Sequence, residues 1–484
     1  MNIKVISRNV GYALLVSALF MFLSILVSLS KGNDSALAAL MISFTITFIV
    51  GIFPFIFVRK TPEITMKDGF MIIVLSWLLS FVFGMLPYAL WGGPFSVENA
   101  WFESVSGFTA TGATILENVE MLPDSLLFWR SSTHFIGGLG VVVFLLLVIP
   151  NSSQMRLRLT NMELSSLSKQ GYNSRSNRTV WIFTCVYFAI LAASFLSYLL
   201  CGMKPFDALN HAMSVTATGG FSTKNASIGA FDSVAVDLVT MVFMVLSSLH
   251  FGMIYAVFVT KSMKPLKNDV FRFYAGVLVV LSVIVTISLK VNGIEQTWGA
   301  SALSGTFHVI SYASTSGFGI ADNSAWPVLP SSLLLFAGIC CGMAGSTTGG
   351  LKADRVLLLF KEVRYHIKQT IHPASVNEVR VNGKVVRQDD VAPHILYIAL
   401  YMAVVILSVS LTLFFDRGNQ YALPATISSL GNVGPAIGDL GVMGNFGAQA
   451  TGAKFMYTVD MFLGRVEIYP VLAVLMMLFN RRTK

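Results

Sequence analysis

Four short stretches of Gly, Thr, Ser and small apolar residues hold the groups of this sequence that could do the most chemistry. Glycine adopts positive φ without a Cβ penalty, so consecutive backbone carbonyls can be aimed at one axis. No carboxylate lies inside these stretches, which favours a dehydrated cation held by carbonyl oxygens over the acidic ring expected for a divalent cation. The candidate cation-binding residues are Thr109, Ala110, Thr111 and Gly112; Thr216, Ala217, Thr218 and Gly219; Ser314, Thr315, Ser316 and Gly317; and Asn432, Val433 and Gly434.

The elements that position these stretches are apolar segments long enough to cross a membrane. Of the 484 residues, 55% are hydrophobic and 12% are charged, whereas soluble domains carry roughly 25% charged residues. About 20 apolar residues suffice to span the hydrocarbon as a helix. The first segment is long for a signal peptide and lacks a convincing cleavage site, so we interpret it as a retained span. We expect ten spans, at about 9–30, 35–58, 68–91, 126–149, 179–202, 234–260, 270–291, 330–360, 393–415 and 455–480.

An internal repeat sets the expected architecture, because the key glycines Gly112, Gly219, Gly317 and Gly434 recur at intervals of about a hundred residues. Irregular backbone is tolerated at membrane depth only where it is buried in protein or lines a watery cavity. We therefore predict an all-α polytopic membrane protein in which four span, pore helix, filter and span repeats surround a central pore. The predicted units are an N-terminal two-helix hairpin at 1–60 and pore repeats at 61–150, 151–265, 266–370 and 371–484.

The basic residues indicate the orientation. Placing the N terminus in the cytoplasm puts most of the 33 Lys and Arg residues on the inside, as the positive-inside rule requires. The C terminus is then also cytoplasmic. The inside segments would be 59–67, 150–178, 261–272, 352–392 and 481–484. The loop 352–392 could dock a cytosolic partner, or could serve only to set the topology.

Several other classes of protein are disfavoured. The net charge of +9 arises from clusters between spans, so nucleic-acid binding is not expected. Cys185, Cys201, Cys340 and Cys341 form no CxxC pair, so neither a disulfide framework nor a zinc site is supported. No HExxH, Walker or Ser-His-Asp arrangement indicates an enzyme.

Two features lie inside predicted spans and invite a functional interpretation. The eighth span contains a run of small residues that would weaken a continuous helix, which indicates either an intramembrane gating loop or close helix packing. Arg465 lies in the last span, where it must face a partner such as Glu467 or Asp460, or a water-filled pore. The candidate gate residues are Gly342, Gly345, Ser346, Thr347, Thr348, Gly349, Gly350 and Arg465.

Over essentially the whole chain, the four stretches resemble, in order, the filters of the Trk/Ktr/HKT superfamily of potassium transporters. The extra N-terminal hairpin resembles the Trk branch more than the shorter Ktr branch. Two departures are His134 and His250, where Gln and Asn would be expected, and the third stretch can be aligned on Ser316 or on Gly317; we choose Gly317. The motifs are TATGA at 109–113, TATGG at 216–220, STSGF at 314–318 and NVGPA at 432–436.

The resemblance implies a gated, potassium-selective pore that takes up potassium across the bacterial cytoplasmic (inner) membrane, with potassium as the transported ion and no organic cofactor. It favours the gating interpretation of the eighth span and an electrostatic barrier at Arg465. It also implies a homodimer and a cytosolic nucleotide-binding regulatory subunit of the TrkA type. The alternative is a sodium- or proton-coupled secondary symporter, but the parallel orientation of the repeats favours a ring-like pore.

Overall fold

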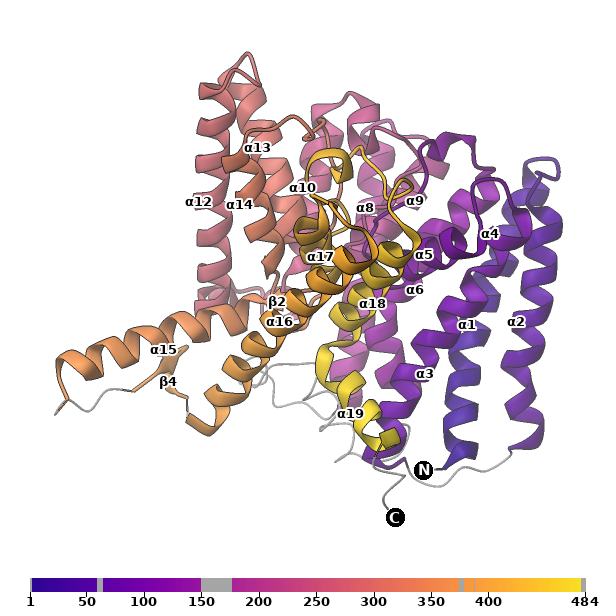
Figure 1. Ribbon diagram of the computed structural model, residues 1–484, viewed down its shortest axis with the longest axis horizontal. Coiled ribbons are helices and arrows are strands. Elements are labelled where there is room, and N and C mark those ends of the chain that lie inside the picture. Colours follow the sequence, from indigo (N-terminus) through magenta and orange to yellow (C-terminus); the bar gives the residue numbers. More distant parts are fainter. Residues whose placement is uncertain (1, 59–63, 149–175, 374–377, 387, 480–484) are drawn as a thin grey trace.

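The computed structural model describes residues 2–58, 64–148, 176–373, 378–386 and 388–479. Within these residues the chain is helical except for connecting segments and two short pairs of strands (Figure 1). The predicted inside loops at 59–67 and 150–178 lie largely outside the described residues.

The N-terminal hairpin and the first two repeats have the expected order of elements. The hairpin consists of α1 (Ile3–Ser30) and α2 (Leu37–Phe57). The first repeat comprises α3 (Met66–Gly84), α4 (Leu86–Trp91), α5 (Val97–Phe108), η1 (Val119–Met121) and α6 (Asp124–Val148). The second comprises α8 (Ser176–Leu200), α9 (Pro205–Ala217), η3 (Ser227–Phe231), α10 (Val234–Ser248) and α11 (Phe251–Thr260).

The third and fourth repeats follow the same plan, with a pair of short strands added to each. The third repeat comprises η4 (Lys264–Lys267), α12 (Asp269–Val291), α13 (Trp298–Ala313), α14 (Val328–Ile339), β1 (Cys340–Cys341), β2 (Leu351–Lys352) and α15 (Ala353–Ile371). The fourth comprises β3 (Arg380–Val381), β4 (Lys384–Val385), α16 (Gln388–Phe415), α17 (Ala422–Gly431), η5 (Gly438–Leu440), α18 (Thr451–Val466) and α19 (Ile468–Phe479). Strands β1 and β2 pair in parallel, and β3 and β4 pair antiparallel.

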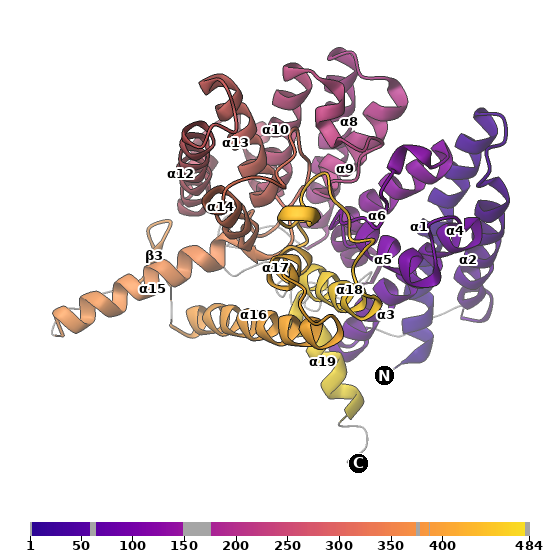
Figure 2. The same ribbon diagram turned by 45° about the horizontal axis from the view of Figure 1, so that its top comes forward.

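The repeats succeed one another around a common centre, as Figure 2 shows when the top of the molecule is turned forward. The helices α5, α9, α13 and α17 occupy the position predicted for pore helices, between the first helical span of each repeat and the helix that leads into its second span. Because each irregular stretch follows one of these helices, the fold delivers all four stretches to the middle of the molecule.

Membrane-spanning helices are present, although three predicted spans are not continuous. Among the described residues, six helices are long and apolar enough to cross a membrane, and two bent pairs raise the number to eight. The predicted span 234–260 is bent by 102° between α10 and α11, and the span 455–480 is bent by 106° between α18 and α19. The span 330–360 is interrupted between Ile339 and Ala353, where β1 and β2 replace helix. The bends within 234–260 and 455–480 were not expected from the sequence, whereas an interruption of 330–360 was one of the two interpretations of its run of small residues.

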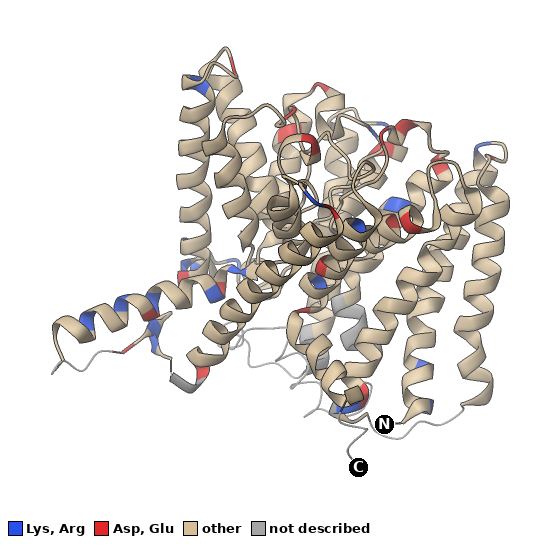
Figure 3. Ribbon diagram, in the orientation of Figure 1, with Lys and Arg blue, Asp and Glu red and all other residues tan. Residues whose placement is uncertain are grey.

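Charge is distributed unevenly along the axis that the spans follow. Lys and Arg gather at the end of the molecule that carries the N terminus and α15, and Asp and Glu are more frequent at the opposite end (Figure 3). This asymmetry agrees with the distribution from which the topology was predicted.

A buried ion pair fixes the first pore helix to the helix that follows it. Glu103 of α5 and Arg130 of α6 lie 2.7 Å apart, with 0% and 2% of their side chains exposed. The Glu103 carboxylate also accepts hydrogen bonds from the Thr114 hydroxyl, at 3.0 Å, and from the Ile115 backbone N–H, at 3.2 Å. The pair thus holds the segment that leaves the first irregular stretch.

We predict that Arg130→Met destabilises the protein by about 3–5 kcal/mol, because it leaves the Glu103 carboxylate buried without its cation. The thermal unfolding midpoint in detergent would be measured. Arg380→Met is the control, since Arg380 and its partner Glu378 are both exposed and such pairs contribute little. Equal midpoints for the two variants would contradict the role of the buried pair.

Candidate ion-conduction site

Each pore helix ends in the same backbone conformation. The residue after the last helical turn, or one further on, is left-handed in all four repeats, with φ between 50° and 55°. The next backbone N–H then donates a 2.9 Å hydrogen bond to a serine carbonyl five residues back. The left-handed residues are Ala110, Thr218, Thr315 and Asn432. The donors are Thr111, Gly219, Ser316 and Val433, and the acceptors are Ser106, Ser214, Ser311 and Ser428.

A glycine with positive φ follows two residues after each left-handed residue. These glycines are Gly112 (φ 84°), Gly220 (φ 84°), Gly317 (φ 69°) and Gly434 (φ 99°). The expected equivalence of Gly219 with Gly112 is therefore wrong by one residue, and Gly220 occupies the matching position. In the third loop the matching position is held by Gly317 rather than Ser316.

The four loops meet in a closed ring. A Cβ on Gly112 would overlap the carbonyl oxygen of Gly219, and a Cβ on Gly220 would overlap that of Ser316. In the same way, Gly317 abuts the carbonyl oxygen of Val433, and Gly434 abuts that of Thr111. The contacts run from the first loop to the second, third and fourth and back to the first. The ring therefore requires glycine at these positions both for the positive φ and for the close approach of neighbouring backbones.

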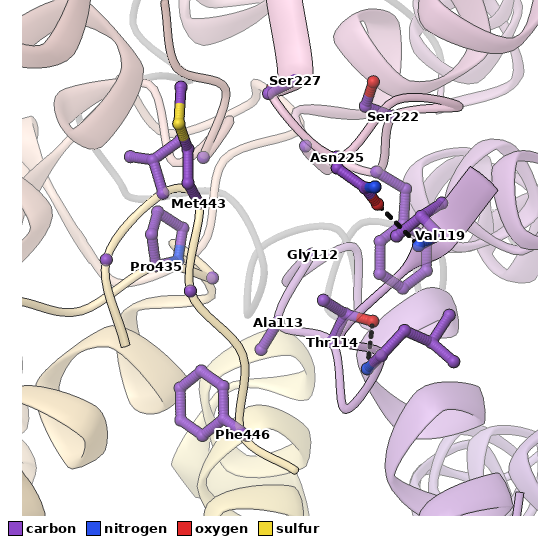
Figure 4. A pocket seen from close by; sticks show the side chains of 18 of the residues that line it. Gly112, Ala113, Thr114, Val119, Ser222, Asn225, Ser227, Pro435, Met443 and Phe446 are labelled. Atoms are coloured by element: carbon purple, nitrogen blue, oxygen red, sulfur yellow. Dashed lines mark hydrogen bonds between the residues drawn. The ribbon is translucent and has the colours of Figure 1, made fainter. Parts of the chain in front are cut away.

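An open pocket lies against this ring and is lined by Gly112, Gly220, Gly317 and Gly434 together (Figure 4). Its empty volume, part of it open to solvent, is about 630 Å³. Glu117, Arg130 and Lys224 contribute charged groups to its lining. In Figure 4, Gly112 and Ala113 lie across the pocket from Pro435. The four predicted loops are thus brought to one solvent-accessible cavity.

The hydroxyl groups of the loops anchor them outward. Thr109 donates to the carbonyl of Val105, and Thr216 donates to that of Ala212, each at 2.7 Å. These bonds return to the preceding turn of the pore helix, so the two hydroxyls secure the helix ends.

Cross-links between repeats were not expected from the sequence. The Asn432 amide donates to the Thr111 hydroxyl, at 3.0 Å, and to the Met461 carbonyl, at 2.8 Å. It thereby ties the fourth loop to the first loop and to α18. The Tyr312 hydroxyl donates to the Ala436 carbonyl, at 2.6 Å, which ties the third pore helix to the fourth loop. A single Asn or Tyr in the sequence does not indicate which distant residue its side chain contacts.

The register of the second loop did leave a signal in the sequence. A serine stands six residues before each ring glycine, and its carbonyl closes the end of the pore helix. The four pairs are Ser106 and Gly112, Ser214 and Gly220, Ser311 and Gly317, and Ser428 and Gly434. When the first two loops are aligned on their shared sequence TATG, this spacing no longer matches between them.

The segment between α14 and α15 lies against the pore-helix end of the ring. The Thr347 hydroxyl donates to the carbonyls of Thr216 and Ser247, both at 3.2 Å. The Gly349 N–H donates to the Thr315 hydroxyl, at 3.1 Å. The segment is also fixed by the Lys352 ammonium, which donates to the Thr348 carbonyl. The candidate gate residues therefore contact the second and third of the four loops directly.

The same segment fills the break between α10 and α11. The Met343 N–H donates to the Ser248 carbonyl, at 2.9 Å, and the Phe251 N–H donates to the Gly345 carbonyl, at 3.0 Å. Gly349 lies outside any helix, and a Cβ on it would lie 2.5 Å from the carbonyl oxygen of Gly431 at the end of α17. The run of small residues is therefore an interrupted segment and not a helix–helix contact, and its role as a gate stays a prediction.

Arg465 joins this segment to the first repeat. Its guanidinium donates to the carbonyls of Thr347, at 2.6 Å, and Gly137, at 2.9 Å, and the side chain is 7% exposed. The carboxylates considered as its partners have other contacts: Glu467 lies 2.8 Å from Arg355, and Asp460 accepts from the Ser408 hydroxyl. A carboxylate partner was one of the alternatives left open for Arg465, and these two hydrogen bonds join it to carbonyls of the interrupted span and of α6.

Comparison with known proteins places this geometry in a family. The family model TrkH, described as a cation transport protein, matches residues 36–481. The Trk system potassium uptake protein TrkH of Halomonas elongata is 30% identical, with 100% of each chain covered. TrkG of Escherichia coli, also named a Trk system potassium uptake protein, is 32% identical over 97% of each chain.

A solved structure agrees with the whole architecture. The crystal structure of the potassium transporter TrkH from Vibrio parahaemolyticus superimposes with a TM-score of 0.88 at 30% identity, covering 98% of this chain and 99% of that one. With its four repeats, its closed ring of loops and these matches over nearly its full length, the chain belongs to the TrkH family of cation transport proteins.

Proposed function

We propose that this protein takes up potassium through a gated pore whose selectivity filter is the ring of four loops. The observation that carries the proposal is the closed succession of contacts from Gly112 through the other three loops and back. The printed names of the relatives, potassium uptake proteins and a potassium transporter, support the choice of ion.

Carbonyl coordination is the chemistry that this ring offers. A dehydrated potassium ion recovers its coordination from backbone oxygens, and the ring oxygens proposed for this are those of Thr111, Gly219, Ser316 and Val433. The C-terminal ends of four pore helices point at the same place, and their partial negative charge favours a cation there. The remaining predicted filter residues, from Thr109 to Gly434, position these carbonyls.

The gate in this proposal is the interrupted span between Ile339 and Ala353. It is hydrogen-bonded to two filter loops and to Arg465, so it obstructs the path while those bonds hold. Arg465 contributes a positive charge beside the path and also secures the obstructing segment. Cation passage therefore requires Thr347 and Arg465 to separate or shift together.

The surroundings proposed for the protein follow from its family and charge distribution. We place it in the bacterial cytoplasmic membrane with both termini in the cytoplasm, as a homodimer with a TrkA-type regulatory subunit on the basic face. Helix α15 and the β3–β4 pair belong to that face (Figure 3). The coupled-symporter alternative gains no support, because the repeats run parallel and the relatives are named uptake proteins.

Potassium uptake can be tested directly. Purified protein in liposomes is expected to pass ⁸⁶Rb⁺ and K⁺ in preference to Na⁺, and expression should restore growth of potassium-uptake-deficient cells at low potassium. Well-inserted protein that neither restores growth nor passes ⁸⁶Rb⁺ would refute the proposed function.

The corrected register predicts the effect of one methyl group. Gly220→Ala should lower ⁸⁶Rb⁺ flux at least about tenfold, since it strains a positive φ and drives a Cβ into the Ser316 carbonyl. Gly276→Ala is the control, because no atom lies within 4 Å of the added Cβ. Flux in Gly220→Ala equal to that of the control would show that Gly220 is not a ring position.

If the interrupted span is a gate, substitutions that loosen it should increase cation flux. Arg465→Ala and Thr347→Val each remove hydrogen bonds that hold the interrupted span, so the cation flux of the isolated protein should rise several-fold, as expected for losing bonds of about 1 kcal/mol each. Arg364→Ala is the matched control, because it also removes a cationic side chain, but one that is exposed on α15. Unchanged flux in both gate variants, at equal protein in the liposomes, would count against a gate at this segment.

A further inference from the structure

A histidine outside the ring lies directly behind the second filter loop. His134 is on α6, one helical turn after Arg130, and its side chain is fully buried. Its Nδ1 lies 3.0 Å from the Ser214 hydroxyl oxygen. Ser214 is the residue whose carbonyl accepts the Gly219 N–H. One hydrogen bond therefore connects the imidazole to the residue that closes the second pore helix.

The same imidazole stacks on the residue that follows the second ring glycine. The rings of His134 and Phe221 are 4.0 Å apart between centroids and inclined by 13°. The Arg130 guanidinium lies 3.9 Å from the Phe221 centroid. A parallel imidazole at 4.0 Å fills one face of the phenyl ring, so the guanidinium must cover the other. Phe221 is thus held between two side chains of α6, and Arg130 is itself fixed by Glu103.

The imidazole also touches the filter backbone between these two points. A Cβ on Gly219 would overlap His134, whose ring supplies the three nearest atoms. Gly219 does not have positive φ, so its backbone conformation suits alanine, and the nearest obstacle to a Cβ is the imidazole. The Gly219 carbonyl, in turn, abuts Gly112 in the ring. His134 therefore contacts the one peptide of the second loop that the ring depends on.

The closing serine of the third loop is bonded differently. The hydroxyl of Ser311, equivalent to Ser214, donates to the Phe318 carbonyl within its own loop, at 2.6 Å. In the second loop the hydroxyl of the closing serine instead bonds to a side chain of the neighbouring repeat. The geometry of the second loop can therefore change without any alteration in its own residues.

We propose that His134 is a positioning residue that determines ion selectivity, by fixing the Gly219 carbonyl through Ser214 and Phe221. This inference rests on the proposed function of the ring as a potassium filter. A carbonyl that is free to move can adapt to a smaller cation, so loosening this contact should reduce discrimination against sodium while the path stays open.

The test is the K⁺/Na⁺ and K⁺/Rb⁺ permeability ratio in proteoliposomes for His134→Leu and Ser214→Ala. Each loses the hydrogen bond, and His134→Leu also loses the stack. We expect the K⁺/Na⁺ ratio to fall about fivefold or more, the scale of one buried hydrogen bond. Tyr198→Phe is the control: it also loses one buried hydrogen bond, to Thr240 and away from the filter, and its ratio should equal that of the unaltered protein.

Rescue supplies a second measurement that does not depend on those variants. Gly219→Ala should lose most of its flux, and Gly219→Ala with His134→Ala should recover it at least in part, with a lowered K⁺/Na⁺ ratio. Ratios that stay unchanged in the active His134 and Ser214 variants, or an absence of rescue in well-inserted protein, would overturn the inference. If the unaltered protein itself did not prefer K⁺ to Na⁺, the proposed function would fail and this inference with it.

Discussion

The constraint on which the rest of the structure depends is that four irregular backbone segments must meet with no side chain between them. At membrane depth a peptide group without a partner is costly, and four helix ends leave several such groups close together. The pore helices close their ends with a left-handed residue and a serine carbonyl, and the ring glycines then let each loop abut the next. Outward hydrogen bonds from Thr109 and Thr216 keep the hydroxyls out of that contact.

Beneath the ring, the three broken spans also leave backbone groups without partners in their own helices. The breaks after Ser248 and Ile339 bond to each other through backbone groups, Met343 to Ser248 and Phe251 to Gly345. Beside the third break, after Val466, the Arg465 side chain donates to the Thr347 carbonyl. Glu467, at this last break, has φ 63° and ψ 151°, a region that side chains seldom enter, and is held there by Arg355. Hydrogen bonds therefore connect the three breaks to one another.

Much of this architecture could be predicted from the sequence, because hydropathy and repetition are strong signals. The hairpin, the four repeats and the run of small residues in the eighth span all emerged from them. The alignment of Gly219 with Gly112 failed for a physical reason. The tetrapeptide TATG is common to both loops, but α5 ends at Phe108 while α9 continues through Ala217, so identical letters adopt different backbone conformations. The backbone conformation of each loop residue depends on its distance along the sequence from the serine whose carbonyl closes the end of the pore helix. The hydrogen bonds of Asn432 and the contacts of His134 depend on side chains that lie far apart in the chain, which a single sequence cannot bring together.

The ring is made by one chain and not by four identical subunits, and its carbonyls belong to Thr111, Gly219, Ser316 and Val433. In a symmetric tetramer a substitution would alter the filter at four equivalent positions. Here a substitution alters one of the four loops. Each loop can therefore have supporting residues of its own, as the second loop has in the imidazole of His134.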